Sequence, residues 1–578
     1  MYLNVSKKKD GRIYLSISKN YRDKGSGKTR TKLVQAIGYV DVLEKDFPDP
    51  IAHFRQVAKE MTENEKETRK VTLSFDMNEN LSEAAAGLRN LGYAIPLAVY
   101  HELELHKFLK KKAYNKSFEF DTNSIMILLV ISRLLMPGSK KKAYENKERY
   151  FERFPFSLDD VYRALTHYDK IAKELQRFLY SKVAQKYKSD TSIIYYDVTN
   201  YYFEIKQPDN IRKYGKAKQN RKKPIVQMGL AMDKNGIPIH YELFSGNTLD
   251  KETFRDVIGE VRRNYDTNRI VVVADMGIIT GDNINYLVGS RPHAPMNGYV
   301  LSFSVRGGTK DFKEYVLDEA GFVDQFGNTA TCESDFKIKS RVIAREINVT
   351  MASGKTKKRT VYEKQIVFWN RKYYVKARAE RAEIVAKAMD IASNPAKYSK
   401  ATSYGAAAYV ENLEYIKGTG EIVKKSLSLN ESKIAEDEKY DGYYSIVTSE
   451  LNMADYEIMD TYSGLWEIEQ TFKITKGDLE ARPAYVSSEN HINAHFLTCF
   501  IALTILRLIQ QRTDKQFSSS KIIECLNRIE CMHEQENIYM FGYRSELSDV
   551  LGKAFDVDFS KKRLRLEDIK KIIADTKK

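Results

Sequence analysis

The spacing of apolar and polar positions divides the chain into stretches of different structural type. Through residues 1–48 short runs alternate with a two-residue period and a turn signal falls at Asp10-Gly11, which predicts a small β-meander. Through residues 49–190 the apolar positions recur with the period of a helix, most strongly from Ser124 to Met136. This second stretch is therefore expected to be a helical domain.

Strand and helix patterns alternate through residues 191–305 in the order β-β-β-α-β-α-β. The segment Asp233-Lys234-Asn235-Gly236 has the composition of a hairpin turn and joins the second expected strand to the third. Antiparallel strands followed by strands joined through helices predict a mixed sheet. The expected strands are 192–198, 224–232, 237–244, 269–274 and 298–304, and the expected helices are 251–265 and 281–289.

The rest of the chain predicts a multidomain α+β protein, since 578 residues exceed what one hydrophobic core supports. Runs such as 365–369 and 372–375 favour strands and predict a β-rich insertion over 306–450. Helices resume over 451–515 and continue as a helical C-terminal tail over 516–578. The apolar run 496–509 is shorter than the roughly 20 residues of a membrane span, so we expect a buried helix there.

The net charge of +16 favours a polyanionic partner, a property that nucleic-acid, ribosome-associated and membrane-surface proteins share. The basic residues of 1–48 and the helical domain are expected to contact DNA, although both also suit solvated surfaces. The densest cluster is expected to clamp the DNA backbone, or else to form a solvated loop. It consists of Arg212, Lys213, Lys216, Lys218, Arg221, Lys222 and Lys223.

Two carboxylates end expected strands in the middle of the chain. An apolar run delivers Asp197, and a second buried run delivers Asp275. A carboxylate at the end of a buried strand is costly unless a cation neutralises it, so the pair suggests a shared metal site. Taken singly, each aspartate also suits a helix cap or a turn.

A third carboxylate lies in the expected helix Asp460–Asp478. Tyr462, Trp466, Glu469 and Lys473 follow spacings of three and four residues, which places them on one helix face. The pattern also suits an ordinary surface ion pair between Glu469 and Lys473.

These motifs resemble the DDE transposases of bacterial insertion sequences, in the branch that carries a Tyr-Arg-Glu-Lys signature. Tyr462, Leu465, Glu469 and Lys476 stand at the four signature positions. Leu465 departs from the signature arginine, which removes one expected phosphate contact or carboxylate orienter. The resemblance implies that Asp197, Asp275 and Glu469 are the catalytic, metal-binding carboxylates.

The same resemblance implies a ribonuclease H-like mixed α/β core, formed by 191–305 and 451–515 and interrupted by the insertion. Three carboxylates can hold two Mg²⁺ or Mn²⁺ ions about 4 Å apart for in-line displacement at phosphorus. Tyr462, Lys473 and Lys476 are expected to contact DNA phosphates. Glu467 competes with Glu469, but the two lie about 200° apart on a helix, so only one faces the site.

The sequence thus predicts a transposase that binds the ends of an insertion sequence, cleaves them and joins their 3′ ends to target DNA. Two alternatives stay open: a metal-dependent nuclease without strand transfer, and an inactive DNA-binding repressor. The expected partners are double-stranded DNA and a second copy in a synaptic dimer, with no membrane. Four cysteines and a start without an apolar leader favour the bacterial cytoplasm, at the nucleoid when DNA is bound.

Overall fold

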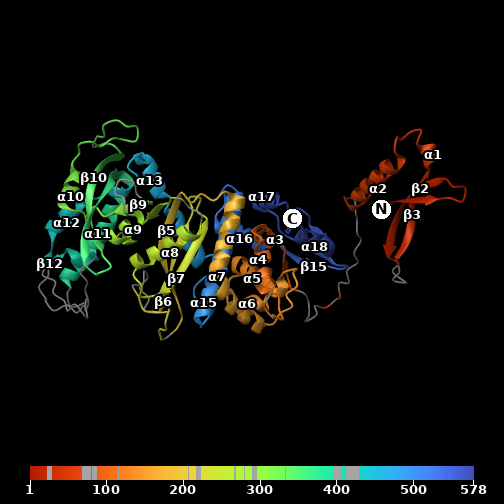
Figure 1. The fold of residues 1–578 in the computed structure, drawn as a ribbon, viewed down its shortest axis with the longest axis horizontal. Coiled ribbons are helices and arrows are strands. Elements are labelled where there is room, and N and C mark those ends of the chain that lie inside the picture. The colour runs from red at the N-terminus through yellow and green to blue at the C-terminus, as the bar shows by residue number, and fades with distance from the viewer. Residues whose placement is uncertain are drawn as a thin grey trace. The chain divides into compact units, whose positions relative to one another are not determined.

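The structure, a computed structural model, consists of two compact units, Met1–Ala85 and Ala86–Lys578 (Figure 1). Each unit is described by itself. The structure describes all residues except 23–28, 68–77, 79, 81–86, 115, 117, 206, 216–222, 266–268, 279, 290–295, 332, 395–404 and 412–427.

The first unit contains a three-stranded antiparallel sheet in the order β1-β2-β3. The expected boundary at residue 48 is wrong, because α2 belongs to the same unit and contacts β1. A small sheet with one apolar face needs an element that covers this face, and Ala58 of α2 is buried together with Leu15 and Ile17 of β2. The elements are β1 (Tyr2–Lys7), β2 (Ile13–Arg22), β3 (Thr29–Tyr39), α1 (Val40–Leu43) and α2 (Pro50–Glu67).

An eight-stranded mixed sheet lies in the second unit, with the order β10-β11-β14-β9-β8-β5-β6-β7. The pairs β5–β8 and β8–β9 are parallel, and the other neighbours are antiparallel. Its strands are β5 (Ile193–Tyr202), β6 (Ile225–Met232), β7 (Pro238–Ser245), β8 (Val271–Ala274), β9 (Gly298–Phe303), β10 (Phe336–Thr350), β11 (Thr356–Asn370) and β14 (Tyr443–Thr448).

The β-β-β-α-β-α-β order predicted for 191–305 is confirmed, with α8 (Asp250–Asn264) and α9 (Gly281–Val288) as its two main helices. Asp233 accepts hydrogen bonds from the backbone N–H groups of Asn235 and Ile237, which closes the predicted hairpin turn between β6 and β7.

The two faces of the sheet pack against different helices, as the alternation of side chains along β5 shows. Tyr196 and Val198 point into a core with α8 and α9, while Tyr195 and Tyr201 belong to the core that contains α7 and α15. Asp197 has the same parity as Tyr195 and Tyr201. It therefore lies on the face of β5 that is turned toward the C-terminal helices.

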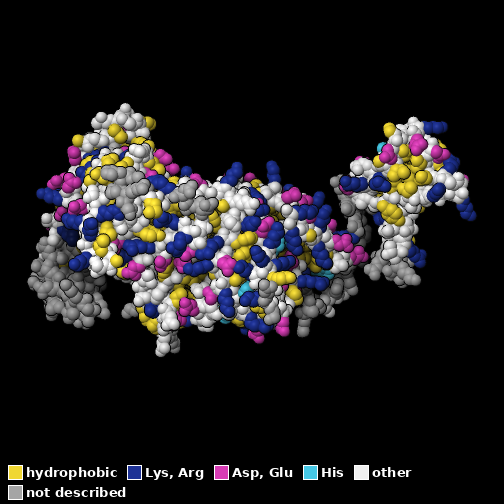
Figure 2. All heavy atoms as spheres, viewed as in Figure 1, with side chains coloured by type: hydrophobic (Ala, Val, Ile, Leu, Met, Phe, Trp, Pro, Cys, Tyr) yellow, Lys and Arg dark blue, Asp and Glu magenta, His cyan; other side chains and the backbone are white. Residues whose placement is uncertain are grey.

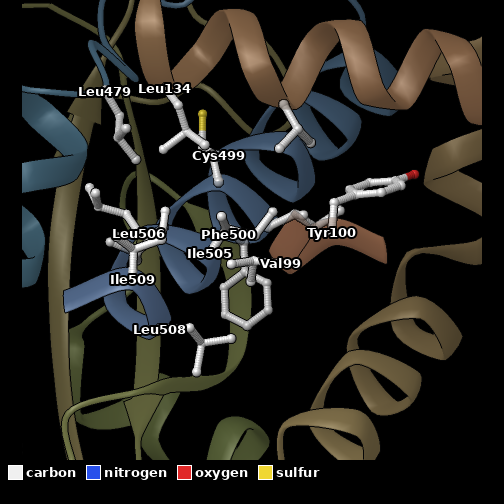
Figure 3. Close-up of a cluster of buried hydrophobic side chains, with 14 of the residues drawn as sticks. Val99, Tyr100, Leu134, Leu479, Cys499, Phe500, Ile505, Leu506, Leu508 and Ile509 are labelled. Carbon is white, nitrogen blue, oxygen red and sulfur yellow. The ribbon is translucent and has the colours of Figure 1, made fainter. Parts of the chain in front are cut away.

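The helices of 49–190 do not form a core of their own. The elements α3 to α7 pack around α15, which comes from far along the chain. Figure 3 shows Val99 and Tyr100 of α3 and Leu134 of α5 in one buried cluster with side chains of α15. In the described part of the chain, α15 alone has the length and apolar composition of a membrane span, and 94% of its apolar window is buried inside the protein. The helices are α3 (Ala94–Glu102), α4 (Leu105–Ala113), α5 (Thr122–Leu135), α6 (Lys140–Glu145), α7 (Leu158–Tyr187) and α15 (Glu489–Arg512), with the short η1 (Lys147–Arg149).

The expected insertion is less β-rich than its sequence indicates. Residues 372–375, expected as a strand, begin the helix α11, because the Asn370 side chain accepts a hydrogen bond from the Lys372 N–H and caps the helix. The strands β10, β11 and β14 extend the main sheet. The other elements are α10 (Lys310–Leu317), α11 (Arg371–Ser393), η4 (Gly405–Tyr409), β12 (Val410–Glu411), β13 (Ser428–Leu429) and α12 (Glu431–Glu438).

The prediction of an all-helical tail over 516–578 is wrong. Three short strands of the tail form a sheet with β4 (Arg89–Asn90), in the order β17-β16-β15-β4. Strands of three or four residues show too little alternation to be recognised, and the partner of β15 lies more than four hundred residues earlier. The elements are α16 (Ser519–Arg528), β15 (Glu530–His533), β16 (Ile538–Phe541), α17 (Glu546–Phe555), β17 (Arg563–Arg565) and α18 (Leu566–Asp575).

Candidate active site

The strand register places the first two predicted carboxylates side by side. The parallel pairing of β5 with β8 matches Tyr195 with Val273. Asp197 and Asp275 each follow these residues by two positions, so they lie at the same level on neighbouring strands. Asp197 is half-buried and Asp275 is exposed.

Asp197 does not end its strand, contrary to the expectation. The strand continues to Tyr202 because β6 pairs with it along its whole second half, where Asp197 lies opposite Leu230. Asp275 does follow the last residue of β8, and the short turn η2 (Met276–Ile278) comes next. Both carboxylates thus lie toward the C-terminal ends of the parallel strands. Asp197 lies within β5, and Asp275 comes directly after β8.

Ser302 of β9 supports Asp275. The pairing of Ala274 with Leu301 brings Ser302 beside Asp275, and the Ser302 hydroxyl donates a hydrogen bond of 2.7 Å to Asp275 Oδ1. The Met276 N–H donates to both Asp275 Oδ1 and Ser302 Oγ. This hydroxyl fixes the orientation of the carboxylate. Nothing near Ser302 in the sequence predicts the contact.

The predicted single helix from Asp460 to Asp478 is in fact two helices, α13 (Asp455–Ser463) and α14 (Trp466–Lys476). The break falls at Gly464, where an added Cβ would lie 2.0 Å from the hydroxyl oxygen of Tyr195. Only a residue without a side chain allows this close approach of the helix to β5. Tyr462 therefore belongs to α13 and does not share a helix face with Glu469.

Helix α14 runs along β5 on the face that carries Asp197. Just before its start Gly464 meets Tyr195, and near its end the Thr475 hydroxyl lies 2.8 Å from the hydroxyl of Tyr201. Glu469, which is exposed, lies between these two contacts along the helix, as Asp197 does along the strand. Helix α14 thus brings Glu469, the third predicted carboxylate, along the part of β5 that carries Asp197.

Glu467 faces another way. Its Oε1 accepts from Lys515 Nζ at 2.8 Å, and its Oε2 lies 3.6 Å from Nη1 of the buried Arg507. Arg507 also donates to the Glu467 backbone carbonyl at 3.1 Å. Glu467 is therefore engaged in an ion-pair network under α14, which favours Glu469 as the site residue.

The phenol of Tyr462 lies within electrostatic reach of all three predicted carboxylates. Burial is the largest cause that raises the pKa of its phenol to about 12, and the charges of Asp275, Glu469 and Asp197 raise it further. A hydrogen bond with Ser302 acts in the opposite direction. The phenol stays protonated at neutral pH and can donate a hydrogen bond to an anionic oxygen at the site.

The two predicted lysines of α14 have different surroundings. Lys476 donates a hydrogen bond to the Thr199 hydroxyl, two residues beyond Asp197 on the same face of β5. Its Nζ also lies 5.6 Å from the centre of the Tyr201 ring. Lys473 is exposed. Lys476 is therefore held at the sheet, and Lys473 is presented to solvent.

The donor set around the site consists of carboxylate and hydroxyl oxygens, the ligands that hard divalent cations prefer. Within the described ranges, no three or more His, Cys, Asp or Glu side chains are close enough to hold a single metal ion together. The negative charges of Asp275, Glu469 and Asp197, which all act on Tyr462, nevertheless favour bound cations.

The expected basic clamp is only partly described, since Lys216, Lys218, Arg221 and Lys222 lie outside the described residues. Arg212 does not suit a DNA contact, because its side chain is buried and bonded to Asp209 at 2.7 Å and to the Ser487 carbonyl at 2.8 Å. Lys213 pairs through its backbone with Ile225, and Lys223 forms an ion pair with Glu204. Over the visible face of the second unit, Lys and Arg side chains are mixed with Asp and Glu (Figure 2).

Comparison with known proteins gives two family matches. The model of the transposase DDE domain matches residues 188–505, more than half of the chain. The model of the N-terminal domain of IS1634 family transposases matches residues 3–71, which covers the first unit through α2. No curated protein matches the chain.

Two solved structures resemble it weakly. One is a cryo-EM structure of the piggyBac transposase synaptic complex with hairpin DNA, at 8% identity over 86% of this chain and 87% of that chain, with a TM-score of 0.32. The other is the Mos1 transposase paired-end complex with the left transposon end, at 13% identity over 41% of this chain and 64% of that chain, with a TM-score of 0.11.

Members of the DDE domain family are DNA-cleaving enzymes whose chemistry depends on divalent metal ions, which agrees with a site built from carboxylates. The family matches extend over the first unit and over the sheet that carries Asp197 and Asp275. The chain therefore belongs to the insertion-sequence DDE transposases.

Proposed function

We propose that this transposase binds the ends of its insertion sequence, cleaves the DNA and joins the 3′ ends to target DNA by two-metal-ion phosphoryl transfer. The observation that carries the proposal is the common level of Asp197 and Asp275 on adjacent parallel strands. Glu469 on the facing helix α14 completes a set of three carboxylates.

The proposed catalytic core is ribonuclease H-like. It consists of the five strands in the order β7-β6-β5-β8-β9, three antiparallel and then two parallel, together with α14. Residues 191–305 and 451–515 supply this core. Residues 306–450 form the insertion between the second and the third carboxylate, and three of its strands lengthen the sheet.

Asp197, Asp275 and Glu469 would hold two Mg²⁺ or Mn²⁺ ions. Bound there, the ions supply activation of the attacking oxygen and stabilisation of the leaving oxygen in an in-line displacement. Ser302 holds Asp275 in one orientation through its hydroxyl. The protonated Tyr462 and the ammonium groups of Lys473 and Lys476 bind phosphate oxygens beside the carboxylates.

DNA is the proposed partner beyond the active site as well. The first unit carries exposed basic positions on β3, among them Arg30 and Lys32, and the helices of 94–187 present further lysines to solvent. In the second unit, Lys213 and Lys223 remain candidates for contacts with the DNA backbone. Pairing of two element ends requires two active sites, so we infer a homodimer in the synaptic complex, in the bacterial cytoplasm.

The deciding experiment is Mg²⁺-dependent cleavage and joining of a labelled element end by the wild type, Asp197→Asn, Asp275→Asn and Glu469→Gln. All three variants should retain DNA binding and lose both reactions. Cut ends without any joined target product would support a nuclease instead. Binding without metal-dependent cutting by the wild type would support a repressor, and activity in all three variants would overturn the assignment.

A further inference from the structure

An arginine lies within the apolar part of α15, on the side of this helix that packs against α14. The Arg507 side chain is 5% exposed. Its chain neighbours Leu506 and Leu508 belong to the buried apolar cluster of Figure 3. A charge in such surroundings is costly unless polar groups bond to it. The partners of Arg507 therefore indicate what an arginine does at this position.

The guanidinium of Arg507 bonds to two residues of α14. Its Nη2 donates to the Glu467 carbonyl at 3.1 Å and to the Thr471 hydroxyl oxygen at 2.5 Å. The Thr471 hydroxyl in turn donates to the same carbonyl at 2.8 Å. On the other side of the guanidinium, Nη1 donates to Gln510 Oε1 at 3.1 Å. Arg507 thus holds one turn of α14 through a backbone carbonyl and a hydroxyl.

The charge of Arg507 is balanced within the same network. Burial lowers the pKa of Arg507, the charge of Glu467 raises it, and an arginine nevertheless stays protonated in proteins. The Glu467 carboxylate lies 3.6 Å from Nη1 and also accepts from Lys515 at 2.8 Å. The carboxylate therefore supplies the opposite charge. The carbonyl and the hydroxyl are directional acceptors, so they decide how the turn is held.

Glu469 lies on the opposite side of the turn that Arg507 holds. Successive residues of an α-helix are about 100° apart, so Glu467 and Thr471 point in nearly the same direction, and Glu469 points about 180° away from the middle of this pair. Burial agrees with this arrangement, because Thr471 is fully buried and Glu469 is exposed. The contact with Arg507 therefore turns Glu469 away from α15.

Helix α14 has few other contacts that fix its rotation near Glu469. It is 11 residues long, and the break at Gly464 separates it from α13. Its hydrogen bonds to β5, through Thr475 and Lys476, lie more than one turn beyond Glu469. A rotation by about 10° would move the Glu469 carboxylate by about 1 Å, since side chains end about 5–6 Å from the helix axis. Side chains of a functional site have to be placed within about 0.5 Å.

We propose that Arg507 is a positioning residue for the proposed metal site, because it fixes the rotation of α14 that presents the Glu469 carboxylate. The inference rests on the proposed function, in which Glu469 is a metal ligand. A guanidinium suits this role, since it offers its N–H groups in a rigid plane, whereas a lysine ammonium is a point charge on a flexible stem. Arg507→Lys therefore keeps the charge beside Glu467 and loses the fixed geometry.

Binding of Mn²⁺ tests the positioning role without relying on catalysis. The full chain with a duplex of the element end is titrated with Mn²⁺, and free Mn²⁺ is measured by electron paramagnetic resonance. Arg507→Lys should weaken Mn²⁺ binding about 10- to 100-fold, as loss of a group that orients a metal ligand typically does. The Mg²⁺ concentration for half-maximal cleavage should rise by a similar factor. In a Glu469→Gln background, Arg507→Lys should not weaken Mn²⁺ binding further, because its effect passes through Glu469.

Arg512→Lys is the matched control. Arg512 lies later on the same helix and pairs with Glu102 of α3 at 2.9 Å, so the same chemical change should leave Mn²⁺ binding unaltered. A second pair of variants tests the other end of the contact. Thr471→Val removes the hydroxyl acceptor and should weaken Mn²⁺ binding in the same direction as Arg507→Lys. Thr471→Ser keeps the hydroxyl and should bind Mn²⁺ as the wild type does.

The outcomes separate this inference from the proposed function. Loss of cleavage in Glu469→Gln, together with unchanged Mn²⁺ binding in Arg507→Lys, would overturn the positioning role and leave the proposed function standing. Equal weakening by Arg507→Lys with and without Glu469 would also overturn it, because Arg507 would then act on the fold as a whole. Cleavage and Mn²⁺ binding that survive Glu469→Gln would overturn the proposed function itself. If Arg507→Lys does not fold, the comparison of Thr471→Val with Thr471→Ser decides.

Discussion

Asp197 and Asp275 stand at one level of two hydrogen-bonded parallel strands, each two residues beyond the matched pair Tyr195 and Val273. Their separation is therefore set by the spacing of strands in a sheet and does not depend on a loop. A site built on rigid elements can hold its ligands precisely. Of the two carboxylates, Asp275 at the exposed edge needs a further contact to fix its orientation.

That contact is the hydroxyl of Ser302, and Ser302→Ala should impair the proposed metal site without removing any of its proposed ligands. The hydroxyl donates to Asp275 Oδ1 at 2.7 Å. Loss of a group that orients a metal ligand typically weakens metal binding about 10- to 100-fold. The expected result is a similar rise in the Mg²⁺ concentration that gives half-maximal cleavage, with the maximal rate partly restored at high Mg²⁺.

Ser302→Thr is the matched control, because it keeps the hydroxyl. Its Mg²⁺ requirement should stay within about threefold of the wild type, since no hydrogen-bonding group is removed. An unchanged Mg²⁺ requirement in Ser302→Ala would show that Asp275 does not depend on this hydrogen bond.

Substitutions of Glu467 and Glu469 should differ in their effects: one should lower the unfolding temperature, and the other should abolish cleavage. Glu467→Gln removes the charge beside the buried Arg507, so it should lower the unfolding temperature by about 2 °C or more while cleavage remains. Glu469→Gln changes an exposed side chain, so it should leave the unfolding temperature unchanged and abolish cleavage. Thermal unfolding and cleavage assays on the same preparations check both, and the reverse result would mean that α14 presents its other face to the DNA.

Gly464→Ala tests the close approach of α14 to β5. The added Cβ would lie 2.0 Å from the Tyr195 hydroxyl oxygen and 2.5 Å from its ring carbon, so the helix must move. Overpacking of this kind costs about 1–3 kcal/mol, and a shifted Glu469 should lower the cleavage rate at least about tenfold. Gly542→Ala is the control, because an added Cβ there meets no atom within 4 Å.

The sequence was sufficient to predict the core strands, because these strands have strong local patterns, while the role of the three carboxylates stays a prediction. The runs that end near Asp197 and Asp275 are continuously apolar, as buried strands are, and Asp233 to Gly236 has the composition of its turn. The agreement of these local signals is the reason that the β-β-β-α-β-α-β order was predicted correctly.

Other features depend on contacts between distant residues and leave no local pattern. The break between α13 and α14 falls at Gly464, where the chain meets the Tyr195 hydroxyl, and a helical spacing continues through this break in the sequence. The burial of Arg212 follows from the Ser487 carbonyl, although its neighbours form the most basic run in the chain. Likewise, β15 exists because β4 pairs with it.

Lys140 should make the stability of the protein depend on pH above about pH 7. Burial lowers the pKa of Lys140 to about 7 in the folded state, against about 10.4 for an unfolded lysine. Between these values the unfolded chain binds the proton and the folded chain does not, so stability rises with pH, by at most about 1.4 kcal/mol per pH unit. The buried Cys499, whose pKa burial raises, acts in the opposite direction as the unfolded thiol ionises.

The difference between the wild type and Lys140→Met isolates the lysine, since Cys499 is common to both. Thermal unfolding in sodium gluconate from pH 7.5 to 9.5 should show a steeper gain of stability with pH in the wild type than in the variant. Parallel profiles would show that Lys140 keeps its proton in the folded chain.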